Sequence, residues 1–166
     1  FVPTPVAGGL TFAVLSGGGQ HTCGLTRIGA AYCWGSNASG QLGVGTGVGS
    51  RPIPLAVSGG ARYVSIAAGP THSCAVATGG VAFCWGRNPG SLLGIGGGAD
   101  VVPTPMAVAG GLRFVSITAG GYRYRARGLD FPLTAGVTTD GLTYAWGDNS
   151  FGQLGSGSNT SATVPV

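Results

Sequence analysis

The stretch HTCGLTRIGAAYCWG, residues 21–35, holds the pattern from which the fold follows. A second copy, THSCAVATGGVAFCWG, ends at residue 86, and its His, both Cys and its Trp are displaced by 51 positions from the first. The Gly-Gly pairs at 8–9, 59–60 and 110–111 keep the same step. Self-similarity at a fixed period of this length indicates a repeat architecture. We therefore divide the chain into three repeats, residues 8–58, 59–109 and 110–166.

The third repeat departs from the other two. Trp146 follows Trp85 by 61 positions, so this repeat carries a ten-residue insertion, which we place near residues 122–131. The repeat also lacks the histidine and both cysteines, because Leu133, Ala135 and Ala145 stand at the equivalent positions.

Each repeat reads as a set of short strands. In the second repeat, residues 62–68 alternate and are rich in β-forming residues, while 72–77 and 81–85 flank Thr-Gly-Gly as the arms of a hairpin. The Val-Pro-Thr-Pro segment at 102–105 belongs at a sheet edge or in a connection, because proline lacks the N–H that a central strand needs. One repeat is thus expected to form a small antiparallel sheet of three or four strands.

A sheet of this size must stack against its copies to bury its faces. Repeats of 40 to 50 residues with four short strands are typical of β-propeller blades. The sequence predicts an all-β fold, a partial β-propeller of three blades of about 51 residues each.

Composition narrows the class of function. The 166 residues include 35 Gly and 10 Pro, and only 7% are charged. A net charge of +4, scattered outside one stretch, argues against nucleic acid as a partner. No apolar run approaches the 18 residues of a transmembrane segment.

The glycine runs at 17–19 and 96–98 lack the Lys and the following helix of a phosphate loop, so no cofactor is expected. With neither an initiator Met nor a signal-peptide pattern, the sequence reads as a processed chain or part of a longer one.

The four cysteines lie at equal distances from the centres of their hairpins. Cys23 therefore faces Cys33, and Cys74 faces Cys84, at a separation that a disulfide can bridge. Both cysteines are absent together from the third repeat, as a bonded pair predicts. Free thiols, or a metal site that includes the histidine two residues before each first cysteine, remain alternatives. Disulfides would indicate an oxidising compartment.

The recurring histidines and tryptophans allow a structural and a functional interpretation. Trp34, Trp85 and Trp146 are expected to fill the same slot between blades, although ligand stacking is the alternative. His21 and His72 are expected to satisfy buried backbone groups, because no acid or nucleophile recurs with them.

The insertion, here called the finger (residues 122–131), is the candidate binding site. Departures from a repeat map to loops that often form the binding face, and Tyr and Arg dominate protein–protein hot spots. A solvated surface loop is one alternative, and contact with nucleic acid or an anionic surface is another. The candidate partner-binding residues are Tyr122, Arg123, Tyr124, Arg125, Arg127 and Phe131.

Two stretches carry a family resemblance. CWGSNASGQLG at 33–43 and WGDNSFGQLG at 146–155 resemble the W-G-x-N-x-x-G-Q-L-G signature of the regulator of chromosome condensation repeat, whereas WGRNPGSLLG at 85–94 matches it less well. The resemblance implies seven-bladed propellers, so the missing blades would come from the rest of a longer chain or from other subunits. The chain most resembles the bacterial secreted members with paired cysteines, which implies an extracytoplasmic bacterial protein.

The expected function is a non-enzymatic protein-binding or assembly module. The resemblance supports it, since family members act as exchange factors for a nuclear GTPase, as chromatin binders and as secreted inhibitors of β-lactamase. A secreted enzyme inhibitor or regulator of this family is one alternative. A propeller enzyme or lectin with a site in the central channel is another, but no carboxylate pair recurs. The acidic residues are Asp100, Asp130, Asp140 and Asp148.

Overall fold

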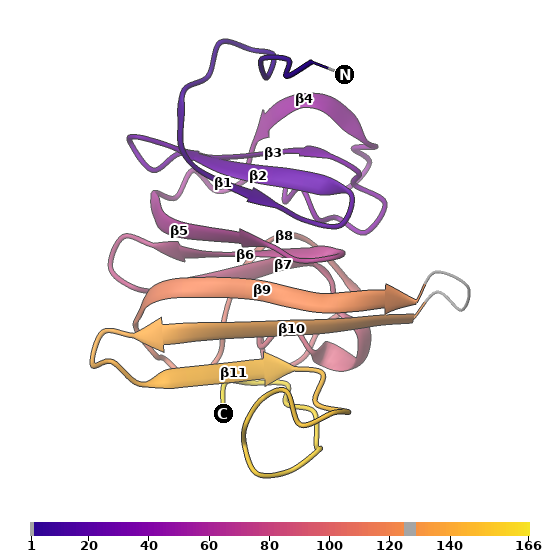
Figure 1. Ribbon diagram of the computed structural model, residues 1–166, viewed down its shortest axis with the longest axis vertical. Helices are drawn as coiled ribbons and strands as arrows, with labels where there is room; N and C mark the ends of the chain where they lie inside the picture. Colours follow the sequence, from indigo (N-terminus) through magenta and orange to yellow (C-terminus); the bar gives the residue numbers. More distant parts are fainter. Residues whose placement is uncertain (1, 125–128) are drawn as a thin grey trace.

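The computed structural model describes residues 2–124 and 129–166, with side chains in the same ranges except at 123, 124 and 129. The predicted all-β class is confirmed, since the described residues form three antiparallel sheets and a single short 3-10 helix, η1 (Pro89–Ser91). The sheets are stacked one above another and form a partial propeller (Figure 1). No helix in the described ranges is long and apolar enough to cross a membrane.

Each sheet is one blade, with its strands side by side in chain order. Blade 1 consists of β1 (Phe12–Gly17), β2 (His21–Thr26), β3 (Ala31–Gly35) and β4 (Arg51–Ala56). Blade 2 consists of β5 (Tyr63–Ala68), β6 (His72–Ala77), β7 (Ala82–Arg87) and β8 (Val101–Ala107). Blade 3 consists of β9 (Phe114–Tyr124), β10 (Leu129–Thr138) and β11 (Thr143–Gly147).

The proline-rich segments lie at the outer edge of their sheets, as expected. β4 and β8 each pair with one neighbour only, so the missing proline N–H groups leave no gap within the sheet. In blade 3 the same place is taken by residues 162–166. Ala162 exchanges both backbone hydrogen bonds with Gly147, and Val166 does so with Ala145.

The first strands of successive blades lie next to one another along the other edge. The Ser16 hydroxyl accepts a hydrogen bond from the Ala68 backbone N–H at 2.9 Å, and the Ser65 hydroxyl accepts one from Ile117 at 3.3 Å. A side chain of one blade therefore satisfies an edge amide of the next, which favours a fixed relation between the blades.

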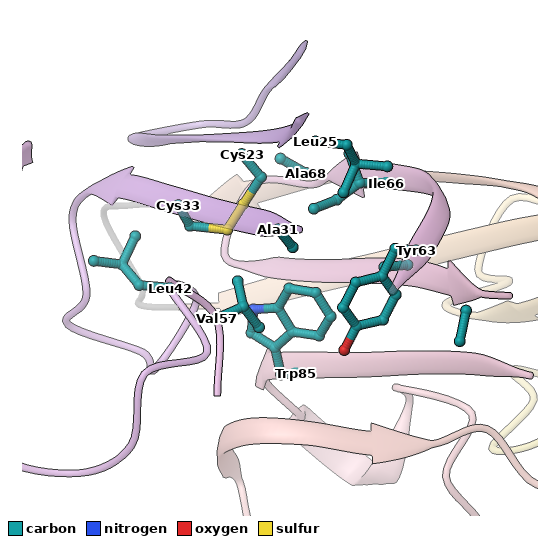
Figure 2. Packing of buried hydrophobic residues seen from close by; sticks show 12 residues of the cluster. Cys23, Leu25, Ala31, Cys33, Leu42, Val57, Tyr63, Ile66, Ala68 and Trp85 are labelled. Atoms are coloured by element: carbon teal, nitrogen blue, oxygen red, sulfur yellow. A yellow bond between two sulfur atoms is a disulfide. The ribbon is translucent and has the colours of Figure 1, made fainter. Parts of the chain in front are cut away.

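The apolar core lies between the blades and forms one cluster at each interface. At the interface of blades 1 and 2, the disulfide of blade 1 lies above Trp85 and Tyr63 of blade 2 (Figure 2). The burial pattern along the second strand of blades 2 and 3 reflects this stacking. All six residues of β6 are buried, because blade 2 is covered on both faces. In β10, buried and half-buried residues alternate over 131–138, because blade 3 is covered on one face.

Candidate functional site

Both predicted cysteine pairs are disulfide-bonded. Cys23 lies opposite Cys33, and Cys74 lies opposite Cys84, in the register of their hairpins. All four side chains are fully buried, and their sulfur atoms are covalently bound, so they are neither free thiols nor metal ligands. No group of three or more His, Cys, Asp or Glu that could hold a metal occurs in the described ranges. The disulfides stabilise each hairpin at the point where the blades stack.

The two histidines connect neighbouring blades. His21 Nε2 lies 2.8 Å from the Ser73 hydroxyl, and His72 Nε2 lies 3.2 Å from the Thr134 hydroxyl. Each histidine thus contacts a side chain of the next blade. The backbone of Leu133 also hydrogen-bonds to His72, so the expected backbone partner is present for that histidine. Burial lowers the pKa of both histidines to about 4, because the charged imidazolium loses its hydration. The imidazoles are neutral at pH 7 and form part of the interface.

Two of the three tryptophans fill the predicted slot between blades. Trp85 Nε1 donates to the Gln41 carbonyl at 2.9 Å, and Trp146 Nε1 donates to the Leu93 carbonyl at 3.0 Å. Both indoles are fully buried. Trp34 differs, because it is half-buried and packs on Phe12 of its own blade, with ring centroids 5.4 Å apart. The recurrent aromatic residues are therefore parts of the scaffold.

The finger continues the sheet of blade 3 as a hairpin. β9 and β10 extend beyond the other strands of the molecule (Figure 1) and stay paired up to Tyr124 and Leu129. Tyr122 faces Phe131 across the hairpin, and their rings stack with centroids 4.5 Å apart. Tyr122 remains 47% exposed beside this stack.

The remaining finger candidates are described only in part. Arg123 and Tyr124 lie on β9, where the structure describes their backbone and not their side chains. Arg125 and Arg127 lie outside the described residues.

An ion pair between blades anchors the base of the finger, and the sequence reasoning missed it. Arg87 Nε at the end of β7 lies 3.4 Å from Asp130 Oδ2 on β10. The Asp130 side chain is only 2% exposed and that of Arg87 34%. Buried carboxylates are costly unless they are paired. The sequence feature that could have indicated this ion pair is Asp130, the single acidic residue within the arginine-rich insertion.

A cavity of about 410 Å³ lies beside the finger and spans all three blades. It is formed in blades 1 and 2 where the first strand turns into the second, and in blade 3 by residues 119–122 of β9. Glycine is required in this floor, because a Cβ on Gly19 would lie 2.7 Å from the Pro70 carbonyl oxygen. Tyr122 forms the wall on the finger side. The lining residues are Gly17, Gly18, Gly19, Ala68, Gly69, Pro70, Ala119, Gly120, Gly121 and Tyr122.

The repeated blades, their buried tryptophans and the Asn-containing loops after them agree with one family of repeats. The sequence profile of the regulator of chromosome condensation (RCC1) repeat matches residues 29–76 and 140–166, and a second profile of the same description matches residues 13–41. Together the two profiles match more than half of the chain. The chain belongs to the RCC1 repeat family.

Relatives of this RCC1 repeat protein are larger. The ultraviolet-B receptor UVR8 of Arabidopsis thaliana is 31% identical over 160 residues, which cover 95% of this chain and 34% of UVR8. The crystal structure of human WBSCR16 matches with a TM-score of 0.77 at 22% identity, over 95% of this chain and 38% of that one. Prp20p of Saccharomyces cerevisiae matches with a TM-score of 0.74 at 25% identity, over 93% of this chain and 37% of that one. The chain thus spans about a third of these proteins.

Proposed function

We propose that this RCC1 repeat protein is a non-enzymatic protein-docking module, and that the finger and the adjoining cavity contact the partner. The observation that carries the proposal is the geometry of Tyr122. Its ring is held by stacking on Phe131, is 47% exposed and lines the cavity of about 410 Å³. A rigid aromatic side chain beside a concavity loses little entropy on binding, which is typical of residues that anchor a protein interface.

The base of the finger supports the same function. The Arg87–Asp130 ion pair ties β10 to β7 of the neighbouring blade, so the finger is positioned by two blades. Three of the eight arginines of the chain lie in the finger sequence, and arginine with interleaved tyrosine suits a protein surface with acidic groups. In this proposal Arg123, Tyr124, Arg125 and Arg127 extend the contact that Tyr122 and Phe131 begin.

Two of the four acidic residues have structural partners, which supports binding over catalysis. Asp148 accepts hydrogen bonds from Ser150 and Gln153 of its own loop, and Asp130 pairs with Arg87. Both carboxylates therefore have structural partners. Among the relatives, Prp20p was described with its binding properties to Gsp1p and histones, and UVR8 is a receptor. These names agree with a regulatory or binding role for this kind of propeller.

We further propose that the protein is extracytoplasmic. We also propose that the chain is part of a larger assembly. Two disulfides in a chain of 166 residues support an oxidising compartment. Inhibition or regulation of a secreted enzyme would be one form of such docking.

Site-specific cross-linking tests the docking surface. A photoreactive phenylalanine analogue replaces Tyr122, and as a matched control it replaces Phe151, which is 81% exposed on the loop after β11. We expect a cross-linked partner protein from extracts of the source organism with the probe at 122 and none with the probe at 151.

A variant without the finger completes the test. Deletion of residues 122–131 joins Gly121 to Pro132 and restores a turn of the length found at Gly69–His72 in blade 2. The deletion should keep the unfolding midpoint near that of the parent chain and abolish capture of the partner. Unchanged capture by this variant would sink the proposal.

A further inference from the structure

A second pocket, here called the junction pocket, lies where blades 1 and 2 meet. Its volume is about 380 Å³, within the range of small-molecule sites in proteins. Tyr63 at the start of β5 lines this pocket, whereas Ala68 at the end of β5 lines the cavity beside the finger. The side chains that line the junction pocket are those of Ser58, Ala61, Tyr63, Phe83, Thr104 and Pro105.

The junction pocket occurs where the second repeat departs from the other two. The first and third repeats read Ala-Gly-Gly-Leu-x-Phe at 7–12 and 109–114, whereas the second reads Ser-Gly-Gly-Ala-Arg-Tyr at 58–63. Ala61 therefore stands where the third repeat has Leu112, which packs against the core cluster of blades 2 and 3. The shorter side chain of Ala61 leaves this room open at the junction of blades 1 and 2.

Three residues of the pocket carry hydroxyl groups where the equivalent positions of the other repeats are apolar. Ser58 and Tyr63 stand where both other repeats have Ala and Phe. Thr104 on the outer strand β8 corresponds in register to Ile53 on β4 and to Val164 in blade 3. The second repeat has thus lost apolar volume and gained polar groups at one place.

Tyr63 and Phe83 form an edge-to-face pair with ring centroids 6.3 Å apart, as Phe12 and Tyr32 do in blade 1 at 6.2 Å. The hydroxyl group has changed rings. Blade 1 carries it on half-buried Tyr32, whereas blade 2 carries it on Tyr63, which is 4% exposed. Figure 2 shows Tyr63 at the end of the core cluster, beyond Trp85 as seen from the disulfide.

The Tyr63 hydroxyl makes no hydrogen bond within the described residues, and neither do the hydroxyls of Ser58 and Thr104. A buried hydroxyl without a partner is costly, and a ligand in the pocket can supply that partner. Burial raises the pKa of Tyr63 above its ordinary value of 10.0, so the hydroxyl keeps its proton at pH 7 and can donate or accept.

The walls of the pocket define the chemical class of the ligand. None of the lining side chains is charged at pH 7, which favours a neutral molecule. The rings of Phe83 and Pro105 offer flat apolar surface to another ring. We propose that the junction pocket binds a small neutral aromatic molecule that carries a hydroxyl group. Its ring packs against Phe83 and Pro105, and its hydroxyl hydrogen-bonds to Tyr63.

Titration of the full oxidised, isotope-labelled chain with para-cresol, followed by NMR, tests the proposal. We expect saturable shifts of the backbone amide signals of Gly59, Ala61 and Thr104. Ala61→Leu restores the residue of the other repeats, so it should fill the pocket and abolish these shifts. Its unfolding midpoint should equal or exceed that of the parent chain, because the longer side chain buries more apolar surface.

Tyr63→Phe removes the hydroxyl alone and also restores the residue of the other repeats. It should raise the dissociation constant of para-cresol roughly fivefold, the effect of one net hydrogen bond. The dissociation constant of toluene, which lacks the hydroxyl, should stay unchanged, whereas a merely structural role of Tyr63 would alter both. Tyr144→Phe is the matched control, because it removes a hydroxyl near the interface of blades 2 and 3 and should affect neither probe.

Two results would overturn the proposal. One is the absence of saturable shifts in the parent chain, and the other is binding of para-cresol by Ala61→Leu with the dissociation constant of the parent chain. The inference goes beyond the docking function and is separable from it, since the two pockets share no residue. Deletion of 122–131 should leave para-cresol binding unchanged, and Ala61→Leu should leave cross-linking from position 122 unchanged.

Discussion

At the scale of single residues, the histidines show how one side chain connects two blades. His21 and His72 are buried and each contacts a hydroxyl on the second strand of the next blade. Their spacing in the sequence revealed the repeat but not the partner. Ser73 and Thr134 are ordinary strand residues until the blades stack, so no local pattern singles them out.

Burial of these histidines predicts a pH dependence of stability. Their pKa in the folded chain is about 4, below the ordinary value of 6.5, so the unfolded chain binds more protons between these values. The free energy of unfolding should be fully retained above pH 6.5 and fall as the pH drops toward 4, by up to about 3 kcal/mol for each histidine. Urea unfolding at pH 7 and at pH 4.5 measures the fall.

The control is His21→Leu combined with His72→Leu, which places in blades 1 and 2 the residue that blade 3 carries at Leu133. It should be less stable than the parent chain at pH 7 but lose less stability on acidification, since only the carboxylates then titrate. An equal loss in both proteins would show that the histidines do not cause the pH dependence.

At the scale of elements, the central hairpin of each blade has the same register. Ala135 lies opposite Ala145 in blade 3, as the cysteines lie opposite each other in blades 1 and 2. The insertion therefore extends the preceding hairpin without altering this one. The sequence placed the insertion near residues 122–131, a range that includes the last residues of β9 and the first residues of β10. It did not reveal the inter-blade ion pair of Asp130, because Arg87 lies in another blade.

The shared register predicts that a third disulfide forms in blade 3. Ala135→Cys combined with Ala145→Cys should oxidise to a disulfide and raise the free energy of unfolding by about 2–3 kcal/mol, the value for a loop of this length. Intact mass after alkylation without reductant, together with urea unfolding, checks both statements. The single variants are the controls and should gain no stability. Two alkylatable thiols in the double variant would contradict the shared geometry.

At the scale of the whole molecule, stability comes from stacking. Both core clusters lie between blades, so each blade depends on its neighbours, as in other repeat proteins. Blade 2 is covered on both faces and blades 1 and 3 on one. Equivalent residues therefore contribute unequally, although their sequences are alike.

Substituting two tryptophans of the same motif measures how much the contribution of a residue to stability depends on its blade. Trp85→Ala should lower the free energy of unfolding by about 3–5 kcal/mol, because the fully buried indole leaves a cavity at the interface of blades 1 and 2. Trp34→Ala should cost clearly less, since Trp34 is half-buried. Denaturant unfolding gives both values. Equal losses would contradict the dependence on position in the stack.

The sequence by itself determined the period, the strand pattern, the hairpin register and the cysteine pairs. These features are local, because strand partners ten residues apart are fixed by the turn between them. Only the tertiary structure decided that histidine meets hydroxyl, that Arg87 pairs with Asp130 and that Trp34 stays half-buried. It also decided that two glycine-rich turns and residues 119–122 of β9 line one open cavity. These contacts join residues in different blades, and the twist and spacing at which blades stack determine them.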